Sequence, residues 1–490
     1  MILKKMRGIL CLVVVVSLIS ATTVLTGATE PTKTIVLKKE EVGATAVKHS
    51  SVIRGMENDL EGMEDSYRDM RKGLEALDNL YDSLSTYKSL ASKKTTTESD
   101  GRFNDMFVIL PQKAGIEMAL LTETNAATIA TLTSDLNTIN TRIGIIQADM
   151  IALPDAEEAT LLTVLEYYQL QTIATQFAFL GINSANISRQ REYDMFVYPL
   201  SVAPHAMQAG IDSMKLGVEA AKAGVSSGAE QLYSALLTLE GYYDLQTAAF
   251  NLKDSEFKST TKKYEKGLVS KAKLEQATNE REIASLEKKK LERDLENLQM
   301  SLKQMLGIEL TTGIDVYTPV DGKRVLNSLN YYITEALKNR SEIKIVDISI
   351  SHKQLELTQV KQYFSSSADQ SLIAESELLE KQLEKQEIQK TIESEIRNAY
   401  NDVLIKDEAF LIKLQELLYA KKSLADIIRY YELGYVTQDA IDGYKISVMQ
   451  KEIDYNDALR KCDDAHKAIK NASLIGPGYN NEGGMSLEEN

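Results

Sequence analysis

One stretch of this sequence occurs twice, and the repetition constrains the fold more than any other feature. The segment Tyr264–Ser270 reads YEKGLVS, and the segment Tyr431–Thr437, at an offset of 167, reads YELGYVT. Each segment opens a longer run, and the two runs close at Leu306-Gly307 and at Ile475-Gly476. The two similar segments, each followed by a run of similar length that closes on glycine, indicate an internal duplication.

The runs that follow the two segments carry the pattern of packed helices. Apolar residues recur at alternating spacings of three and four, which is typical of a helix that lies along a partner helix. Polar residues interrupt the pattern at different steps in the two copies. We therefore expect helices in a shared register whose sequences have diverged. The first copy of this seam is Ala277, Arg281, Ala284, Lys288, Leu291, Leu295, Leu298 and Leu302, and the second is Tyr444, Val448, Lys451, Tyr455, Ala458, Cys462, Ala465 and Ile469.

The repeat extends upstream of each segment. Tyr233 opens YSALL, and Tyr400, again at an offset of 167, opens YNDVL. Each copy thus predicts a helix, a break at Gly267 or Gly434, and a second helix. Glycine is favoured where a helix ends in a left-handed conformation, and the Ser or Thr that follows can cap the next helix. The sequence predicts a long antiparallel hairpin, made twice, with both turns at one end.

Composition supports an all-α protein. The chain has 490 residues, seven prolines, no tryptophan and 26% charged residues, which is the profile of long helices. The segment 1–28 combines three basic residues, an apolar run and small residues near Ala28, as a cleavable secretory signal does. An uncleaved anchor is the alternative. Cys11 lies inside the apolar run, which gives no indication of a lipid anchor.

The charge of the remaining chain restricts its partners. Without the three basic residues of the signal, 53 Lys and Arg residues face 71 Asp and Glu residues, a net charge of −18. Nucleic acid is disfavoured, because phosphate binding requires a basic surface. Cys462 is then the single cysteine, so no intrachain disulfide can form. Because it occupies the seam, we interpret it as a small buried residue and not as a reactive thiol.

The first copy is the longer one. The segment Ala46–Ile53 resembles Ala336–Ile343 at an offset of 290, not 167, so the first copy is longer by 123 before it reaches Tyr233. We assign residues 29–310 to a first repeat with an insertion at about 95–203, residues 322–477 to a second repeat, and residues 478–490 to a disordered tail.

The insertion reads mainly as helix. Residues 126–150 and 156–179 predict helices on either side of Pro154, and two similar segments, DMFV before Pro111 and DMFV before Pro199, suggest proline-containing bends at its limits. Short strands are an alternative for its threonine-rich faces. Lys93–Gly101 is rich in Thr and Ser and predicts a loop.

Three further segments have local patterns. We expect the chain to enter a helix from Thr34, and we expect a turn region over Thr311–Asp321. Isoleucines at 343, 345, 348 and 350 suit a strand by their spacing, but the correspondence with the first copy favours a helix there.

No arrangement of residues indicates catalysis or a bound cofactor. Gly224–Gly228 reads GVSSG and matches a nucleophile elbow, but that motif needs a preceding strand, and the surrounding sequence is helical. The histidines at positions 49, 205, 352 and 466 are scattered singly, so we expect no metal site. There is no phosphate loop and no dinucleotide fingerprint. We interpret the chain as a non-enzyme without cofactors.

The duplicated motifs resemble the TolC family of outer membrane efflux proteins. The resemblance rests on the YEKGLVS turn, the helix that closes on Leu-Gly, the upstream Tyr-x-x-Leu-Leu and the copy start ALKNRSEI. It implies a homotrimeric duct of long helices in an export complex with an adaptor (membrane fusion) protein and an inner membrane pump. The tip of the duct would meet the adaptor, and it corresponds here to Tyr264, Gly267, Leu268, Tyr431, Gly434 and Tyr435.

The sequence departs from this family in two respects. Family members carry a pair of membrane-barrel strands in each copy, whereas Gln362–Gln370 leaves almost no room for them and the insertion reads as helix. The family also favours aspartate six residues after the turn glycine, where Lys273 and Ala440 stand here. Asp439 and Asp442 lie nearby, but off register.

Two functional hypotheses follow. The first is an exported duct component of a multi-component exporter, in the outer membrane or periplasm, or at the surface of a single-membrane cell. The alternative is a secreted coiled-coil structural or scaffold protein of the cell envelope without transport activity. The sequence does not identify a transported substrate.

Overall fold

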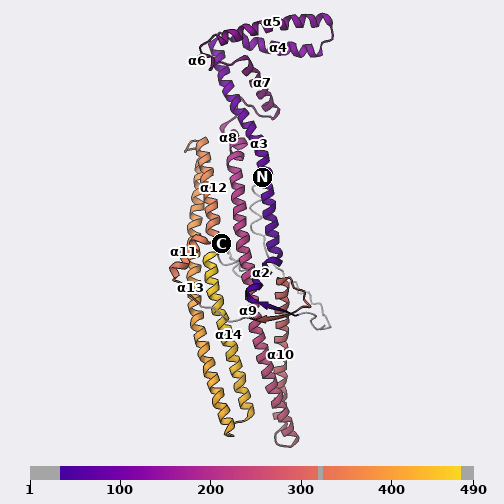
Figure 1. Cartoon of the computed structure of the whole chain (residues 1–490), viewed down its shortest axis with the longest axis vertical. Coiled ribbons are helices and arrows are strands. Elements are labelled where there is room, and N and C mark those ends of the chain that lie inside the picture. The colour runs from indigo at the N-terminus through magenta and orange to yellow at the C-terminus, as the bar shows by residue number, and fades with distance from the viewer. Residues whose placement is uncertain (1–33, 318–323, 476–490) are drawn as a thin grey trace. The chain divides into compact units, whose positions relative to one another are not determined.

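The computed structural model describes residues 34–317 and 324–475, and within these ranges the chain is almost entirely helical (Figure 1). The expected all-α class is confirmed. The expected signal peptide, Pro319 and the expected tail lie outside the described residues. Among the residues described, none of the helices is long and apolar enough to cross a membrane.

Short connections join most of the helices. In chain order the helices are α2 (Lys39–His49), α3 (Ser51–Asp100), α4 (Asn104–Thr122), α5 (Ala126–Ile151), α6 (Asp155–Glu158), α7 (Val164–Phe179), α8 (Arg189–Glu192), the π-helix η1 (Tyr193–Val202), α9 (Ala203–Glu265), α10 (Lys271–Leu306), α11 (Leu329–Asn339), α12 (Ser341–Tyr363), α13 (Asp369–Glu432) and α14 (Gln438–Leu474).

Two short strands correct the sequence analysis. β1 (Thr34–Lys38) lies where a helix was expected, and β2 (Gly313–Tyr317) lies in the expected turn region. The strands pair in parallel, with Thr34 opposite Gly313 and Lys38 opposite Tyr317. Side chains of β1 alternate between exposed and half-buried positions, which is the period of a strand and not of a helix. Such pairing over a long sequence separation leaves no local pattern that would have predicted it.

The duplication is visible in the helix boundaries. α9 ends at Glu265 and α13 at Glu432, and α10 begins at Lys271 and α14 at Gln438, so both pairs keep the offset of the two turn segments. α9 has 63 residues and α13 has 64, while α10 has 36 and α14 has 37. Each copy therefore contains the expected long helix and shorter partner.

The starts of the two copies also correspond. α2 and α11 have 11 residues each, and both end at a one-residue break, at Ser50 and at Arg340. Ser50 accepts a hydrogen bond from the Ile53 amide and so caps α3. Arg340 is almost fully buried and pairs with Glu342 and Glu395 at 2.5 and 2.6 Å. The isoleucines from 343 to 350 lie in α12, as expected.

The additional residues of the first copy begin within a longer helix. α3 has 50 residues where α12 has 23, and it runs through the segment 93–100 that was expected to be a loop. The threonines there are compatible with helix because the Thr95 and Thr96 hydroxyls donate to carbonyls four residues earlier. Thr97 is buried, and it accepts a hydrogen bond from the Leu162 amide at 2.6 Å. Tertiary contact thus overrides the local composition.

Helices α4 and α5 form a hairpin in the insertion, whereas the sequence suggested a hairpin of residues 126–150 with residues 156–179. The second predicted helix, 156–179, is instead interrupted after α6, and α7 begins with a capping box made by Thr163 and Glu166. Pro154 occupies the N-cap position of α6, in agreement with a break there. Pro111 and Pro199 lie inside α4 and η1, so these two prolines do not form the expected bends.

The chain forms two compact units that do not coincide with the two repeats. Of the described residues, unit 1 contains 34–49, 228–317 and 416–457, and unit 2 contains 50–227, 324–415 and 458–475. Each unit therefore takes helical segments from both copies. The repeat boundaries proposed from the sequence stay a prediction.

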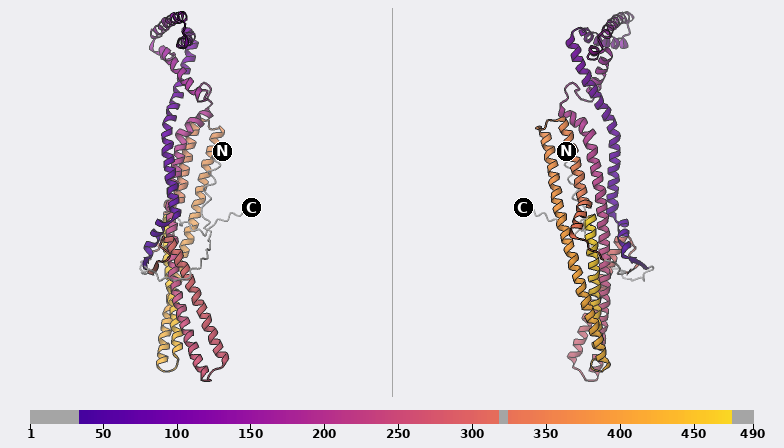
Figure 2. Two further views of the ribbon diagram at one scale, coloured as in Figure 1. Left: turned by 90° about the vertical axis from the view of Figure 1, so that its right-hand side faces the viewer. Right: turned by 60° about the vertical axis from the view of Figure 1, so that its left-hand side comes forward.

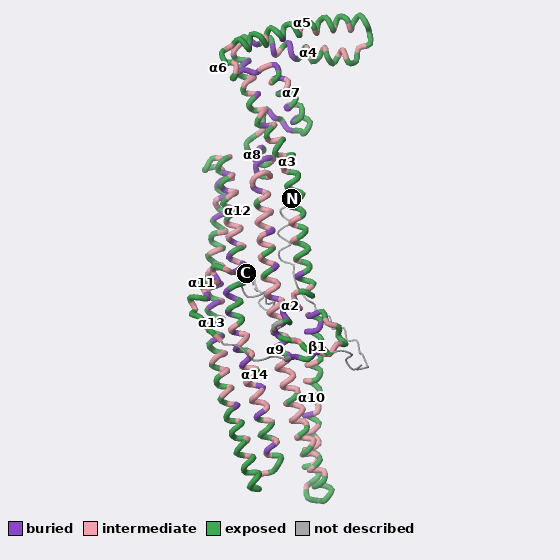
Figure 3. The backbone as a smooth tube through the Cα atoms, viewed as in Figure 1, coloured by how far each residue is buried: buried purple, intermediate pink, exposed green. Residues whose placement is uncertain are grey.

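Unit 2 has several core clusters of buried residues, and Figure 3 marks buried positions along the backbone. In one of them Leu84, Phe177 and Phe196 are fully buried. Next to it a polar network links the helices, because Tyr363 donates to Glu192 and lies 2.8 Å from the hydroxyl of Tyr81. Lys88 pairs with the same Glu192 at 2.5 Å. This network fixes α12 against the α3 and η1 region.

Candidate functional site at the two hairpin turns

The first hairpin turn joins α9 to α10 within unit 1. Gly267 has a φ of 71°, and its amide donates to the Tyr264 carbonyl at 2.8 Å. The Leu268 amide donates to the Lys263 carbonyl at 2.8 Å. These two bonds form a Schellman-type helix end, which favours glycine in the left-handed position. Ser270 then caps α10 by accepting from the Lys273 amide, as expected.

The second turn repeats this geometry at the offset of the duplication. Gly434 has a φ of 78°, and its amide donates to the Tyr431 carbonyl at 2.8 Å. The Tyr435 amide donates to the Tyr430 carbonyl at 2.9 Å. Each donor and acceptor of these two bonds thus occupies the position that the duplication predicts.

The two turns lie at the same end of unit 1 (Figures 1 and 2). Both expose apolar side chains: Leu268 is 70% exposed and Tyr435 is 76% exposed. Tyr264 and Tyr431 are exposed to a smaller degree. The turns therefore present two similar apolar tips on equivalent backbones at one end of the unit.

Aromatic rings explain the polar interruptions of the first seam. The Arg281 guanidinium lies 5.4 Å from the ring centre of Phe257, and the Lys288 ammonium lies 5.6 Å from that of Tyr243. Both rings belong to α9, so cation–π contacts replace apolar packing at these steps. Leu295 and Leu298, which a buried seam would hide, are only half-buried.

The second hairpin holds its helices with ion pairs in unit 1. Lys451 of the seam pairs with Glu416 at 2.8 Å, and Lys421 pairs with Glu452 at 2.7 Å. Tyr444, at the start of the predicted seam, is exposed. The seam is thus a mixed polar and apolar contact near the turns.

Helix α13 carries an apolar surface that faces away from its own packing contacts. Five residues, 43 to 61% exposed, recur at a spacing of seven: Leu404, Ile405, Leu411, Ile412 and Leu418. We call these five residues the outward stripe. Val403 and Leu417, on another face of the same helix, are buried. A seven-residue repeat of exposed apolar residues is typical of a helix that packs against a further helix.

One group of side chains was missed in the sequence. The Cys462 thiol donates to Asp407 Oδ1 at 2.8 Å, and His466 Nε2 lies 3.0 Å from the same oxygen. Cys462 is a free, buried cysteine, and burial, and then the bond to Asp407, raise the pKa of its thiol to about 12. The four-residue spacing of Cys462 and His466 was a visible signal, but Asp407 belongs to another helix.

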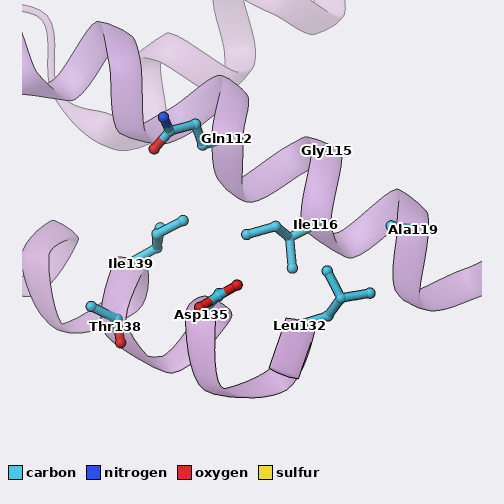
Figure 4. Close-up of a pocket in the computed structure, with 8 residues that line it drawn as sticks. All are labelled: Gln112, Gly115, Ile116, Ala119, Leu132, Asp135, Thr138 and Ile139. Atoms are coloured by element: carbon cyan, nitrogen blue, oxygen red, sulfur yellow. The ribbon is translucent and has the colours of Figure 1, made fainter. Parts of the chain in front are cut away.

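A groove of about 490 Å³ lies between α4 and α5 (Figure 4). Its polar lining residues are Gln112, Asp135 and Thr138, and its apolar ones include Ile116, Leu132 and Ile139. By contrast, Gly224–Gly228 lie within α9, so the strand and sharp turn that a nucleophile elbow requires do not form there.

Comparison with known proteins finds solved structures that are similar to this chain. No family model matches the chain, and no curated protein matches its sequence. One similar solved structure is the CmeC outer membrane channel of Campylobacter jejuni, with 14% identity, 59% of this chain and 70% of that chain covered, and a TM-score of 0.46. The outer membrane protein VceC of Vibrio cholerae has 14% identity, 57% of this chain and 76% of that chain covered, and a TM-score of 0.42. CusC has 12% identity, 56% of this chain and 73% of that chain covered, and a TM-score of 0.43.

These three structures are outer membrane proteins, and each is similar to this chain with a TM-score below 0.5. The similarity covers 56 to 59% of this chain in these three comparisons. Duplicated hairpins are the arrangement that the TolC resemblance of the sequence implies, and α9–α10 and α13–α14 provide them.

Proposed function

We propose that this protein is an extracytoplasmic, TolC-like helical duct component of a multi-component exporter in the cell envelope. The observation that carries the proposal is the pair of equivalent hairpin turns, which share their hydrogen bonds and expose Leu268 and Tyr435 at one end of unit 1. Leu268 is 70% exposed and Tyr435 is 76% exposed in the described part of the chain. A partner that covers both tips accounts for this exposure, and the family resemblance of the sequence makes that partner an adaptor protein.

A duct also requires several chains, and the outward stripe of α13 supports this part of the proposal. Five exposed apolar residues at seven-residue spacing would be costly in water unless another helix covers them, since each buried aliphatic side chain contributes about 1.5–3 kcal/mol. A second copy of the chain is the occupant that the family resemblance implies, and the expected assembly is a homotrimer.

The function can be tested with an export assay in the source cell. Cells that lack the protein should retain a panel of fluorescent efflux dyes, and the wild-type chain should restore their export. Export should fail when Leu268→Asp and Tyr435→Asp are combined, because charges at the tips would have to be buried against the adaptor. Lys289→Asp, which changes an exposed residue of α10 far from the turn, should restore export.

The result also separates the two hypotheses from the sequence. If deletion of the protein changes cell shape or envelope integrity and leaves the export of every dye unchanged, the protein is a structural component of the envelope. A tip variant that exports as well as the wild type would contradict the role proposed for the turns, even if the duct itself exists.

A further inference from the structure

We propose that Asp407, Cys462 and His466 form a binding site for a transition-metal dication of the zinc class. The site lies within unit 2 and contains residues of α13 and α14. It is independent of the proposed transport function.

The backbone places the three ligand atoms together. Cys462 and His466 are four residues apart on α14, and this spacing puts their side chains on the same face of a helix. Asp407 faces them from α13. The three ligand atoms lie within 4.8 Å of one another. Ligand atoms around a tetrahedral zinc ion, with bonds of about 2.0–2.3 Å, are about 3.3–3.8 Å apart, so small side-chain movements are sufficient.

The donor set selects the class of metal. A thiolate sulfur, an imidazole nitrogen and a carboxylate oxygen are the three ligand types of zinc, whereas magnesium and calcium prefer oxygen ligands alone. Binding would replace the proton of the Cys462 thiol by the metal and release that proton to solvent. His466 would offer Nε2 and keep its proton on Nδ1. Three protein ligands leave a fourth position for water.

The surrounding charges are compatible with a cation. Arg324 is a basic group near the cluster, and its Nε pairs with Asp463 at 2.6 Å while its guanidinium lies 4.8 Å from the ring centre of Phe410. Its charge is thus offset by a carboxylate outside the cluster. Asp407 and a Cys462 thiolate would balance the two charges of the metal.

The three side chains of the site differ in how far they are buried. Cys462 is fully buried and the His466 side chain is 13% exposed, while Asp407 is more accessible at 37%. A metal could enter from the Asp407 side, while the sulfur ligand stays shielded from oxidants and other thiols. A bound metal would tie α13 to α14 and stabilise unit 2.

The test uses cobalt as a visible substitute for zinc with the full-length chain. The wild type should bind one Co²⁺ with a sulfur-to-cobalt absorption band in the near ultraviolet, and Zn²⁺ should displace it. The band should vanish in Cys462→Ser. In His466→Gln and Asp407→Asn the affinity should fall by more than about 10-fold. The matched control, His205→Gln, changes an exposed histidine of α9 and should bind as the wild type does.

Thermal unfolding supplies a second readout. Zn²⁺ should raise the melting temperature of the wild type and of His205→Gln, because a ligand of the folded state stabilises it. It should not raise that of Cys462→Ser, whose helical circular dichroism must match the wild type for a valid comparison. If the wild type shows no sulfur-to-cobalt band, or if Cys462→Ser binds equally, the three residues are a hydrogen-bonded cluster and the proposal is wrong.

Discussion

The carboxyl group of Glu240 makes the stability of the folded chain depend on pH. Burial, and then the neighbouring carboxylates of Asp315 and Asp244, raise the pKa of Glu240 from 4.5 to about 7. In the unfolded chain the carboxyl group loses its proton near pH 4.5, whereas in the folded protein it keeps that proton up to about pH 7. Its contribution to stability is therefore present at low pH and is lost as the pH rises through about 7.

We expect Glu240→Gln to remove this pH dependence. Relative to the wild type, the variant should gain about 1 kcal/mol of unfolding free energy between about pH 5 and about pH 8, a figure reduced from the full shift because Glu240 is partly exposed. Urea unfolding of both proteins at the two pH values measures the difference. Parallel pH profiles for the two proteins would show that the Glu240 carboxyl titrates normally.

Individual residues also show where sequence reasoning stops. The seam pattern correctly predicted that Cys462 is buried, because burial follows from its position on one helix face. The pattern could not supply Asp407, which lies on another helix. The polar breaks at Arg281 and Lys288 were likewise visible, but the α9 rings that stabilise them became identifiable only in the folded chain.

Among the elements, the hairpin turns were the most predictable. The left-handed glycine, the capping residue and the helix ends of each turn depend only on the seven adjacent residues of the turn segment. β1 and β2 were missed because their pairing is non-local, and the end of α3 was missed because Thr97 is held by a contact with Leu162. Local rules therefore described the elements well wherever no distant partner intervened.

Replacing the turn glycines should lower the stability of the protein, whereas replacing a glycine inside a helix should raise it. Gly267→Ala and Gly434→Ala should each cost about 1–2 kcal/mol, because alanine is strained at positive φ although neither site is crowded. Gly443→Ala, within α14, should instead stabilise the protein by about 0.5–1 kcal/mol. Urea unfolding measures all three. A cost at Gly443 equal to that at the turns would refute the left-handed geometry as the cause.

At the scale of the whole molecule, a duct requires that several copies of the chain associate. Neither compact unit corresponds to one repeat, and the long helices α9, α13 and α14 pass through both. The sequence predicted the duplicated hairpins, but only the folded chain shows that the outward stripe of α13 is exposed. We propose that other copies of this chain cover the outward stripe.

Sedimentation velocity of the full-length protein, across the micromolar range, tests this claim most directly. The wild type should sediment as a trimer, and Leu411→Asp combined with Ile412→Asp should sediment as a folded monomer, because the charges would be buried in the interface. Lys289→Asp places a negative charge on an exposed site of α10, outside the stripe, and should remain trimeric. A wild type that is monomeric throughout, with normal helical content, would contradict the duct and favour the structural alternative.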